Sequence, residues 1–446
     1  MHTRKMAVSL AKKSLGTLVS KGAILFLRFP FGIIVARFLG PEGKGLLHLL
    51  MMSTSMSAAL GQLGQGSAAV YFIGKDTRRF PAIFTNLLVV AGVVSVVLWG
   101  AGWFFLHFIR PDLYARLPVY MWGIAAVMLL ILILHSFLTQ ALSAFLRIKE
   151  INLVQVAGVL LDLVLLVVFV VVLGAGVGGA LLAHAVSDVT VAVALLLLLF
   201  RYAGRPGTPD WALLKASLRF GLKSYLYNLE RRVNLRLDVF LVAGLAAGGV
   251  AATGVYSVAV NVAELILFLP VSIRMSLLPM VAGGSTAEAN RLTSMACRHT
   301  MFLSVLMACA FALAGPVALP LAYGEQFVDA VVPLLILLPG VVLLSQARIL
   351  YSDLVGRGRP EVSTVSAAAG MVITVVLDLL LIPSYGVVGA AVASTSAYAV
   401  EFFIASFFFL RISQIPWNEV LLLQNGDLWR YHGLLYSFVR RKHVGA

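Results

Sequence analysis

Apolar runs of about 20 residues recur along this chain of 446 residues, and they constrain its fold more than any other feature. A run of that length crosses the hydrocarbon core of a bilayer as a helix. Hydrophobic residues make up 61% of the chain and charged residues 12%, whereas a soluble domain carries about a quarter charged residues. Residues 191–200 are apolar at every position, which is not the alternating pattern of a transmembrane β-barrel. The sequence therefore predicts an all-α integral membrane protein.

Polar breaks divide the apolar runs into twelve predicted transmembrane helices, six in each half of the chain. If the N-terminus is inside, 21 Lys and Arg residues fall in cytoplasmic loops and 3 in the opposite loops, which is the asymmetry expected of a membrane protein. A wrong number of spans would mix the two sets. We therefore predict a multi-pass protein with cytoplasmic N- and C-termini. The predicted spans are 15–38, 45–73, 82–108, 117–145, 151–173, 178–200, 216–243, 251–281, 299–323, 329–355, 362–383 and 386–410.

The two halves of the sequence repeat each other. Gly45 corresponds to Gly254 at an offset of 209 residues, and Gly176 corresponds to Gly386 at an offset of 210. Because each half has an even number of helices, the two halves are expected to share one orientation in the membrane, as parallel six-helix lobes. The predicted domains are an N-terminal lobe 1–202, a cytoplasmic linker 203–215, a C-terminal lobe 216–411 and an amphipathic tail 412–446 lying on the inner surface.

Ten basic residues fall inside the predicted spans, where lipid should exclude them. In the first span, twelve large aliphatic or Phe residues favour insertion by about 5 kcal/mol, and each basic residue costs up to ~2.5–3.5 kcal/mol. Lys21 and Arg28 lie seven residues apart and share one helix face, so we expect them to face an aqueous cavity. Arg37 lies near the outer end, where its side chain can extend to the interface.

The seventh predicted span is also unusually polar. If it and the first span form opposite walls of a cleft, the cleft is cationic, and its Arg side chains are suited to bind phosphate oxygens in pairs. An anionic head group, pyrophosphate above all, is the ligand that such a cleft favours. The candidate substrate-binding residues are Lys21, Arg28, Lys223, Arg231, Arg232 and Arg236.

Acidic residues in the spans have two interpretations, since each could couple transport to an ion or pair with a nearby Arg. His135 and His184 are expected to pack or to form hydrogen bonds, because no second ligand lies at metal spacing. No metal site and no cofactor are predicted. The candidate ion-coupling or ion-pair residues are Glu230, Asp238, Glu264, Asp162 and Asp188.

Two other classes of function find no support in the sequence. Phosphate-binding loops and metalloprotease motifs are missing, and the longest outward loop, 109–118, is short for an enzyme site, so the chain is not expected to be an enzyme. The net charge of +15 could suggest nucleic acid, but the basic residues are scattered among short loops. Their distribution is typical of membrane topology instead.

Four segments in order along the chain resemble a known family. They are 36–45 (Ala-Arg-Phe-Leu-Gly-Pro-Glu-Gly-Lys-Gly), 254–259 (Gly-Val-Tyr-Ser-Val-Ala), 321–327 (Leu-Ala-Tyr-Gly-Glu-Gln-Phe) and 378–391, which begins Asp-Leu-Leu-Leu-Ile-Pro. Together they resemble the polysaccharide-exporter branch of the MOP superfamily, which comprises multidrug, oligosaccharidyl-lipid and polysaccharide exporters. The likeness extends over nearly all of residues 10–411.

The resemblance implies a two-lobed, MATE-like bundle that flips undecaprenyl-pyrophosphate-linked oligosaccharide across the bacterial inner membrane by alternating access. It implies a cationic central cavity and, as partners, the lipid-linked substrate, the phospholipid membrane, a polysaccharide polymerase and glycosyltransferases. Two alternatives stay open. One is a cation-coupled multidrug antiporter of the same superfamily, which the surplus of cations disfavours; the other is a membrane polysaccharide polymerase or transferase.

Overall fold

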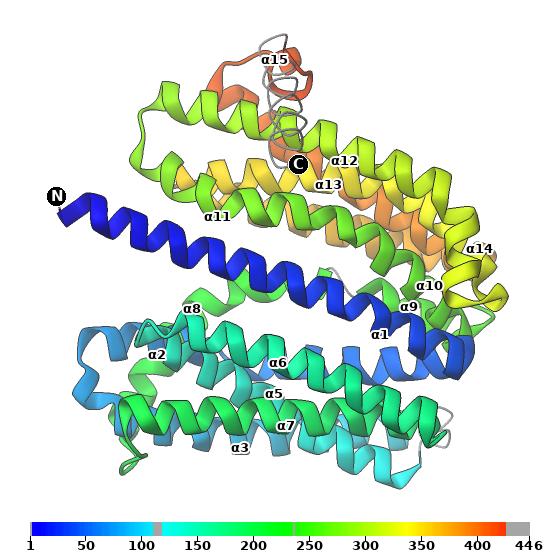
Figure 1. Cartoon of the computed structure of the whole chain (residues 1–446). Coiled ribbons are helices and arrows are strands. Elements are labelled where there is room, and N and C mark those ends of the chain that lie inside the picture. The colour runs from blue at the N-terminus through cyan, green and yellow to red at the C-terminus, as the bar shows by residue number, and fades with distance from the viewer. Residues whose placement is uncertain (1, 110–117, 235–236, 425–446) are drawn as a thin grey trace, which may run out of the picture. The chain divides into compact units, whose positions relative to one another are not determined.

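The computed structural model describes residues 2–109, 118–234 and 237–424, and every regular element in that part of the chain is a helix (Figure 1). Long apolar runs form these helices because a helix satisfies all of its backbone hydrogen bonds internally. The elements up to residue 234 are α1 (His2–Gly61), α2 (Gln65–Lys75), η1 (Thr77–Arg79), α3 (Phe80–Phe104), η2 (Phe105–Ile109), α5 (Val119–Ala144), α6 (Ile148–Leu166), η3 (Val167–Val172), α7 (Gly176–Ala203) and α8 (Trp211–Asn234).

The second half of the chain continues in the same way, with two short 3-10 helices between long α-helices. Its elements are α9 (Leu237–Leu245), α10 (Gly249–Ala263), η4 (Glu264–Leu267), α11 (Phe268–Gly283), α12 (Thr286–Tyr323), η5 (Glu325–Ala330), α13 (Val331–Gly356), α14 (Pro360–Ser413) and α15 (Trp417–Leu421). Of the predicted surface tail, α15 is the described helical part, and residues 425–446 lie outside the described residues.

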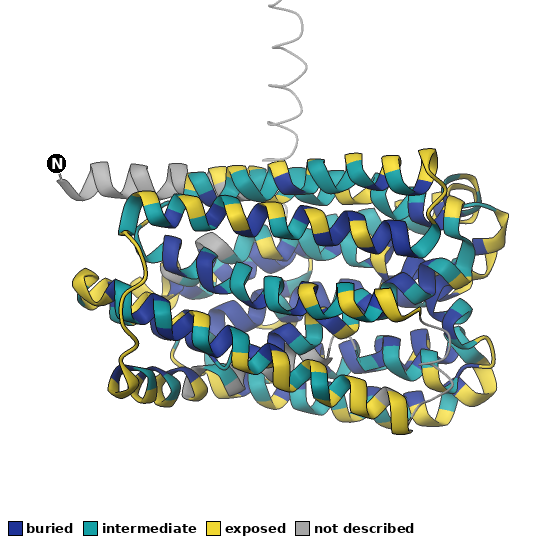
Figure 2. Ribbon diagram, turned by 90° about the horizontal axis from the view of Figure 1, so that it is seen from below, coloured by how far each residue is buried: buried dark blue, intermediate teal, exposed yellow. Residues whose placement is uncertain are grey.

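Nine helices in the described part of the chain are long and apolar enough to cross a membrane. Large apolar side chains remain exposed along them, including Val96 at 71% and Leu313 at 83%. Figure 2 shows these exposed positions, in yellow, recurring along helices whose other faces are buried. Soluble proteins rarely expose so much contiguous apolar surface, so these faces belong against lipid. The predicted all-α membrane fold is confirmed, while the number twelve stays a prediction.

Two of the longest helices change direction at a glycine. In α1, Gly40 has φ 67°, and Lys44 Nζ lies 3.4 Å from the carbonyl oxygen of Gly32. Residues twelve apart in a straight helix would be about 18 Å apart, so the chain turns back at Gly40. In α14, Gly386 has φ 55°. Gly40 falls in the break between the predicted spans 15–38 and 45–73, and Gly386 is the first residue of the predicted span 386–410.

The predicted repeat also appears in the backbone conformation. Gly176 and Gly386, which correspond at an offset of 210, both adopt left-handed φ values, 59° and 55°. Gly45 and Gly254 touch each other, because a Cβ on Gly45 would lie 2.9 Å from the backbone nitrogen of Gly254. Two glycines that the repeat equates are therefore in direct backbone contact.

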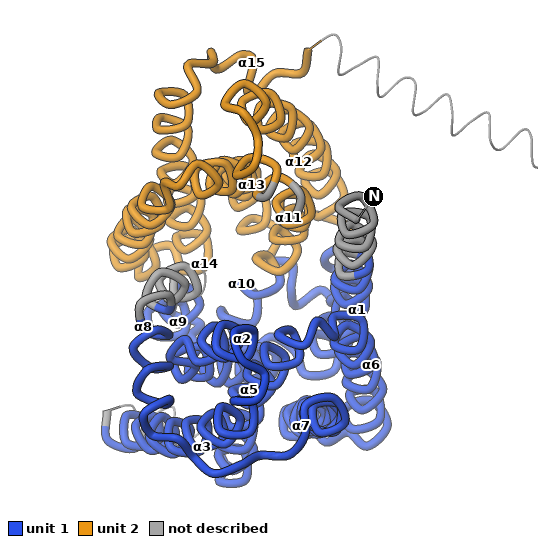
Figure 3. The backbone as a smooth tube through the Cα atoms, turned by 90° about the vertical axis from the view of Figure 1, so that its left-hand side faces the viewer, with its two compact units in different colours: residues 1–258, 319–329 blue, residues 259–318, 330–446 orange. Residues whose placement is uncertain are grey.

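By internal contacts the chain forms two compact units (Figure 3). Unit 1 comprises Met1–Val258 and Leu319–Asp329, and unit 2 comprises Ala259–Ala318 and Ala330–Ala446. In unit 1, one core is built around Phe80, Phe84 and Ile133. In unit 2, the core includes Cys297, which is buried among apolar side chains as a packing residue. These units are not the predicted lobes, whose boundaries stay a prediction.

Candidate functional site

A partly buried acid and a buried histidine meet between α6 and α7 in unit 1. Nδ1 of His184 lies 2.9 Å from Oδ2 of Asp162, and the two side chains are 11% and 16% exposed. The other polar atoms of the pair, Oδ1 of Asp162 and Nε2 of His184, are buried and have no hydrogen-bond partner among the described residues. Buried polar atoms are nearly always paired, so these two mark a place where a proton, a cation or water can bind.

Small residues bring the two helices close enough for this contact. A Cβ on Gly158 would lie 2.3 Å from Cγ2 of Val191, so α6 and α7 touch at this glycine. Ser187 Oγ donates a 2.8 Å hydrogen bond to the carbonyl oxygen of Gly158. One turn further along α6 lies Asp162, and this close approach sets its register against α7. The ring of Phe31, from α1, lies 4.5 Å from the ring of His184 and covers it.

Asp188 completes the group, one turn after His184 on the same face of α7. It is half-buried, and it interacts electrostatically with His184, Asp162 and Arg28. We call Asp162, His184 and Asp188 the acid–histidine cluster. The structure thus brings two of the predicted coupling residues together and places one predicted substrate-binding residue, Arg28, beside them. The predicted hydrogen-bonding role of His184 is confirmed.

Lys21 and Arg28 are both exposed on α1, seven residues apart. They therefore present one cationic face to their surroundings, as their spacing predicted. The helix that carries them contacts α6, α7 and α8 within unit 1.

The first part of the polar seventh predicted span, 216–243, lies in helix α8. Lys223, Glu230, Arg231 and Arg232 lie on this helix, but their side chains are outside the described residues, as is Arg236 altogether. The predicted pairing of their charges is therefore not described.

The remaining two predicted acids have different surroundings. Asp238, in the first turn of α9, is buried; its Oδ2 accepts a 2.7 Å hydrogen bond from Tyr256 and its Oδ1 a 2.8 Å bond from the backbone of Val239. That arrangement holds the start of α9 against α10. Glu264 begins η4 and is half-buried.

Sequence reasoning missed two other basic residues. Lys44, expected in an outward loop, is buried at 6% exposure, with Nζ 5.7 Å from the ring centre of Tyr323. Arg37, expected to extend to the interface, donates to the last carbonyl oxygens of α12, with Nε 2.8 Å from that of Ala322. A cation at that end is stabilised by the helix dipole. The position of Lys44 depends on the reversal at Gly40, which brings it back beside Gly32.

Asp353 in unit 2 forms an ion pair that the sequence analysis did not identify. Its Oδ2 lies 2.6 Å from Nε of Arg357, one turn further along α13. Thr293 of α12 donates to its Oδ1 at 2.7 Å. The i, i+4 spacing of Asp353 and Arg357 is the signal that could have identified this pair.

The comparisons with known proteins agree with this architecture. Residues 10–285, more than half of the chain, match the family described as polysaccharide biosynthesis protein. An uncharacterised membrane protein of Methanocaldococcus jannaschii is 22% identical over 432 residues, which are 91% of this chain and 99% of that protein.

Solved transporters share the fold. Lipid II flippase MurJ in an inward closed conformation superposes with a TM-score of 0.74 at 12% identity, over 91% of this chain and 90% of that chain. An inward-facing multidrug resistance MATE transporter of the MOP superfamily gives 0.71 at 21% identity, over 88% and 94%. A MOP superfamily transporter from Pyrococcus furiosus, described as having a binding pocket of reverse polarity, gives 0.63 at 18% identity, over 91% and 95%.

These identities are low, so the structural likeness establishes the fold, and the family match over 10–285 establishes the family. The chain belongs to the polysaccharide biosynthesis protein family, with the membrane fold of the MOP superfamily.

Proposed function

We propose that the protein is a flippase for an undecaprenyl-pyrophosphate-linked oligosaccharide in the bacterial inner membrane. It moves the lipid from the inner to the outer leaflet by alternating access. The observation that carries this proposal is the cationic face of α1, where Lys21 and Arg28 are exposed on a helix that otherwise suits lipid. Such charges are expensive in a bilayer and mark a substrate pathway. The family match supports a role in polysaccharide synthesis.

The proposed site binds the pyrophosphate or an acidic sugar. Arg28 has a planar guanidinium that can bind two phosphate oxygens at once, and Lys21 adds a compact charge on the same face. Lys223, Arg231, Arg232 and Arg236 are proposed to supply the cations of the second wall. A polymerase and glycosyltransferases are the proposed partners, because they would make the substrate and consume the product.

We further propose twelve spans with both termini in the cytoplasm. Among the nine candidate helices, α1 turns at Gly40 and α14 turns at Gly386, so each can supply two spans. The polar helix α8 with α9 supplies the remaining one. The test labels single cysteines in a Cys297→Ser, Cys309→Ser background with an impermeant thiol reagent. Arg205→Cys should react from the cytoplasmic side and Glu42→Cys from the opposite side; the same side for both would overturn the topology.

The acid–histidine cluster is the proposed coupling site. It is buried, it contains a histidine that can take up a proton, and atoms of Asp162 and His184 are left open for a ligand. Arg28 lies beside it, so occupancy of the cluster would change the potential at a proposed substrate-binding residue. This cluster also favours a second candidate function, cation-coupled drug antiport, and a solved structure of similar fold is a multidrug resistance transporter.

The experiment that tests the flippase uses proteoliposomes and a fluorescent polyprenyl-pyrophosphoryl sugar, with the corresponding monophosphate as comparison. The full-length protein should flip the pyrophosphate probe. Arg28→Ala should lower the rate at least about tenfold, because a charge-assisted hydrogen bond contributes about 1.5–3 kcal/mol. Arg28→Lys should retain part of the rate.

The matched control is Arg359→Ala, which removes one exposed charge at the end of α13 and should leave the rate unchanged. Equal rates for the wild-type protein and Arg28→Ala would overturn the proposed site. Proton-driven export of a cationic dye without any flipping of the pyrophosphate probe would favour the antiporter.

A further inference from the structure

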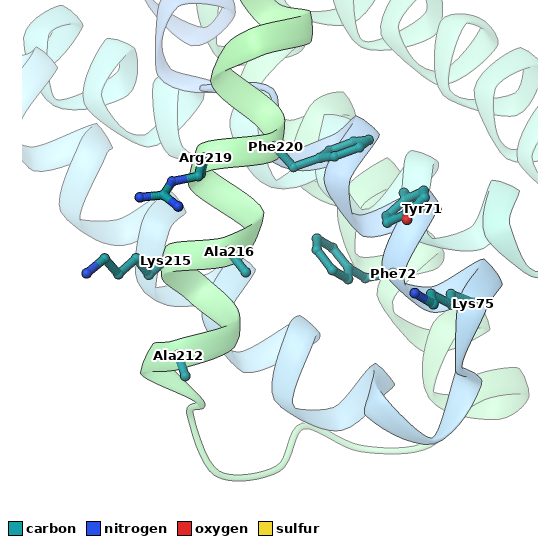
Figure 4. Close-up of a pocket in the computed structure, with 8 residues that line it drawn as sticks. All are labelled: Tyr71, Phe72, Lys75, Ala212, Lys215, Ala216, Arg219 and Phe220. Atoms are coloured by element: carbon teal, nitrogen blue, oxygen red, sulfur yellow. The ribbon is translucent and has the colours of Figure 1, made fainter.

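The aromatic and basic groove between α2 and α8 in unit 1 plays no part in the proposed transport site. It has a volume of about 540 Å³ and lies where the last turns of α2 meet the first turns of α8 (Figure 4). Its lining residues are Tyr71, Phe72, Lys75, Ala212, Lys215, Ala216, Arg219 and Phe220.

The groove exists because the two helices touch at one point and leave space beyond it. A Cβ on Gly64 would lie 2.1 Å from the carbonyl oxygen of Gly221, so the backbones are in contact there. One turn earlier on α8, Ser217 Oγ donates to Oε1 of Gln65 at 2.9 Å. Further toward the start of α8, Ala212 and Ala216 present side chains too small to fill the gap to α2.

Three aromatic rings form a wall of the groove. The rings of Tyr71 and Phe220 stack with centres 4.6 Å apart and planes 16° apart. Phe72 meets Phe220 edge to face, with ring centres 6.0 Å apart. Figure 4 shows Phe220 pointing from α8 toward the two rings of α2. The stacking holds these rings in place, so the apolar wall is present before any ligand arrives.

Three cations lie near this wall. Lys215 and Arg219, one turn apart, line the groove, and their side chains extend from α8 on the side away from the three rings, whereas Lys75 ends α2 on the ring side (Figure 4). All three are exposed, and within the described part of the chain none of them makes a salt bridge. The nearby acid, Asp76, is already paired with Arg78 and Arg79. No acid lines the groove in the described residues.

The position of the groove is that of a membrane interface. Lys75 is followed by the short polar connection that precedes α3, and Trp211, at the start of α8, is 64% exposed. Exposed Trp at the end of a membrane helix lies at the level of the lipid head groups. The predicted topology places this end on the cytoplasmic side, where basic pockets between helices bind the head groups of anionic lipids.

We propose that this groove binds the head group of an anionic phospholipid from the cytoplasmic leaflet. The phosphate lies at the mouth of the groove beside Lys75, where the long exposed side chains of Lys215 and Arg219 reach it by rotating toward the groove, and the glycerol and the start of an acyl chain lie against Tyr71, Phe72 and Phe220. A soluble phosphate compound would leave the aromatic wall without a partner, and a zwitterionic lipid would leave the three cations uncompensated. Binding here fastens the start of α8 to α2 and stabilises unit 1.

The test uses the purified full-length protein in a neutral detergent, titrated with short-chain phosphatidylglycerol or phosphatidylcholine and followed by native mass spectrometry and thermal unfolding. Phosphatidylglycerol should bind and raise the melting temperature, and phosphatidylcholine should not. The triple variant Lys75→Ala, Lys215→Ala, Arg219→Ala should weaken phosphatidylglycerol binding roughly 100-fold, since each basic residue near an anionic lipid contributes about a factor of five.

The control is a second triple variant, Arg205→Ala, Arg291→Ala, Arg359→Ala, which removes three positive charges from exposed residues outside the groove. It should bind phosphatidylglycerol as the wild type does. A further variant, Phe220→Ala, tests the aromatic wall while keeping all three cations. It should weaken the binding of phosphatidylglycerol more than the binding of glycerol phosphate. Equal loss in both triple variants, or glycerol phosphate that competes as well as the lipid does, would overturn the proposal.

Discussion

Unit 2 buries the side chain of Asp353 and unit 1 partly buries that of Asp162, and the two acids are held in opposite ways. In unit 2, both oxygens of Asp353 accept hydrogen bonds, from Arg357 and from Thr293. In unit 1, Asp162 contacts His184 through Oδ2, and its Oδ1 has no hydrogen-bond partner among the described residues. A saturated network holds one protonation state and one geometry, whereas an open pair can change its proton or ligand. The comparison therefore separates Asp353, an acid with a structural role, from Asp162, an acid that can take part in transport.

Asp353→Ala should have the largest effect on stability. It leaves the nearly buried guanidinium of Arg357 without its carboxylate, and breaking a buried pair in this way costs about 3–5 kcal/mol. We expect little folded protein by size-exclusion chromatography in detergent. Glu361→Ala, which removes an exposed acid from the first turn of α14, serves as the control and should behave as the wild type. A fully stable Asp353→Ala protein would show that the network is not structural.

Asp162→Asn should leave the fold intact and affect transport. The amide has the size of the carboxylate and can still accept from His184, so stability should change by about 1 kcal/mol or less. The variant cannot exchange a proton, and transport of the pyrophosphate probe driven by a pH gradient should fall at least about tenfold, within the usual range of coupling energies. Wild-type transport in Asp162→Asn, with the wild-type response to pH, would remove the distinction between the two acids.

His184→Gln tests the other half of the open pair and should have a smaller effect. Glutamine can donate to Asp162 but cannot take up a proton, so the contact survives and the titratable group is lost. We expect transport to fall about threefold and to lose part of its dependence on pH. His135→Gln changes a histidine of α5 outside the cluster and should leave the pH profile as it was. Identical profiles for both variants would assign His184 a packing role.

The difference between the two acids also shows how far sequence can predict this molecule. The fold class, the shared face of Lys21 and Arg28, and the correspondence of Gly176 with Gly386 follow from the sequence pattern. The structure confirms the all-α membrane fold, exposes Lys21 and Arg28 seven residues apart on α1, and gives the two glycines the same left-handed conformation. The contact of Asp162 with His184 does not follow from spacing. It depends on the register of α6 against α7, which packing at Gly158 determines.

Lys44 shows a second reason why the sequence does not predict some features of the structure. Its burial requires α1 to turn back at Gly40 and so to place Lys44 beside Gly32. A hydropathy pattern locates such a turn, but it does not say which side chains the turn encloses. The Asp353–Arg357 pair, by contrast, lies one turn apart on a single helix, and its spacing alone was sufficient to predict it.

Asp76 extends the comparison to an exposed acid, and Asp76→Ala should have the smallest effect. Its Oδ1 accepts a 3.1 Å hydrogen bond from the backbone of Arg78, and the carboxylate pairs with the side chains of Arg78 and Arg79. That backbone hydrogen bond first, and then the two guanidinium groups, hold the pKa of Asp76 below its ordinary value. Water screens the ion pairs, so the loss of stability at pH 7 should be near the limit of detection.

The sign of its pH dependence distinguishes this acid from the others. A carboxylate whose pKa is lowered in the folded protein contributes stability above its unfolded pKa of about 3.9 and loses it as the pH falls through the folded value. Any difference in melting temperature between the wild type and Asp76→Ala should therefore be constant from pH 5 to pH 8 and should shrink as the pH falls from the unfolded pKa of about 3.9 through the lower folded pKa. A difference that grew on acidification would contradict this assignment, because it would require a carboxyl group stabilised in its protonated form.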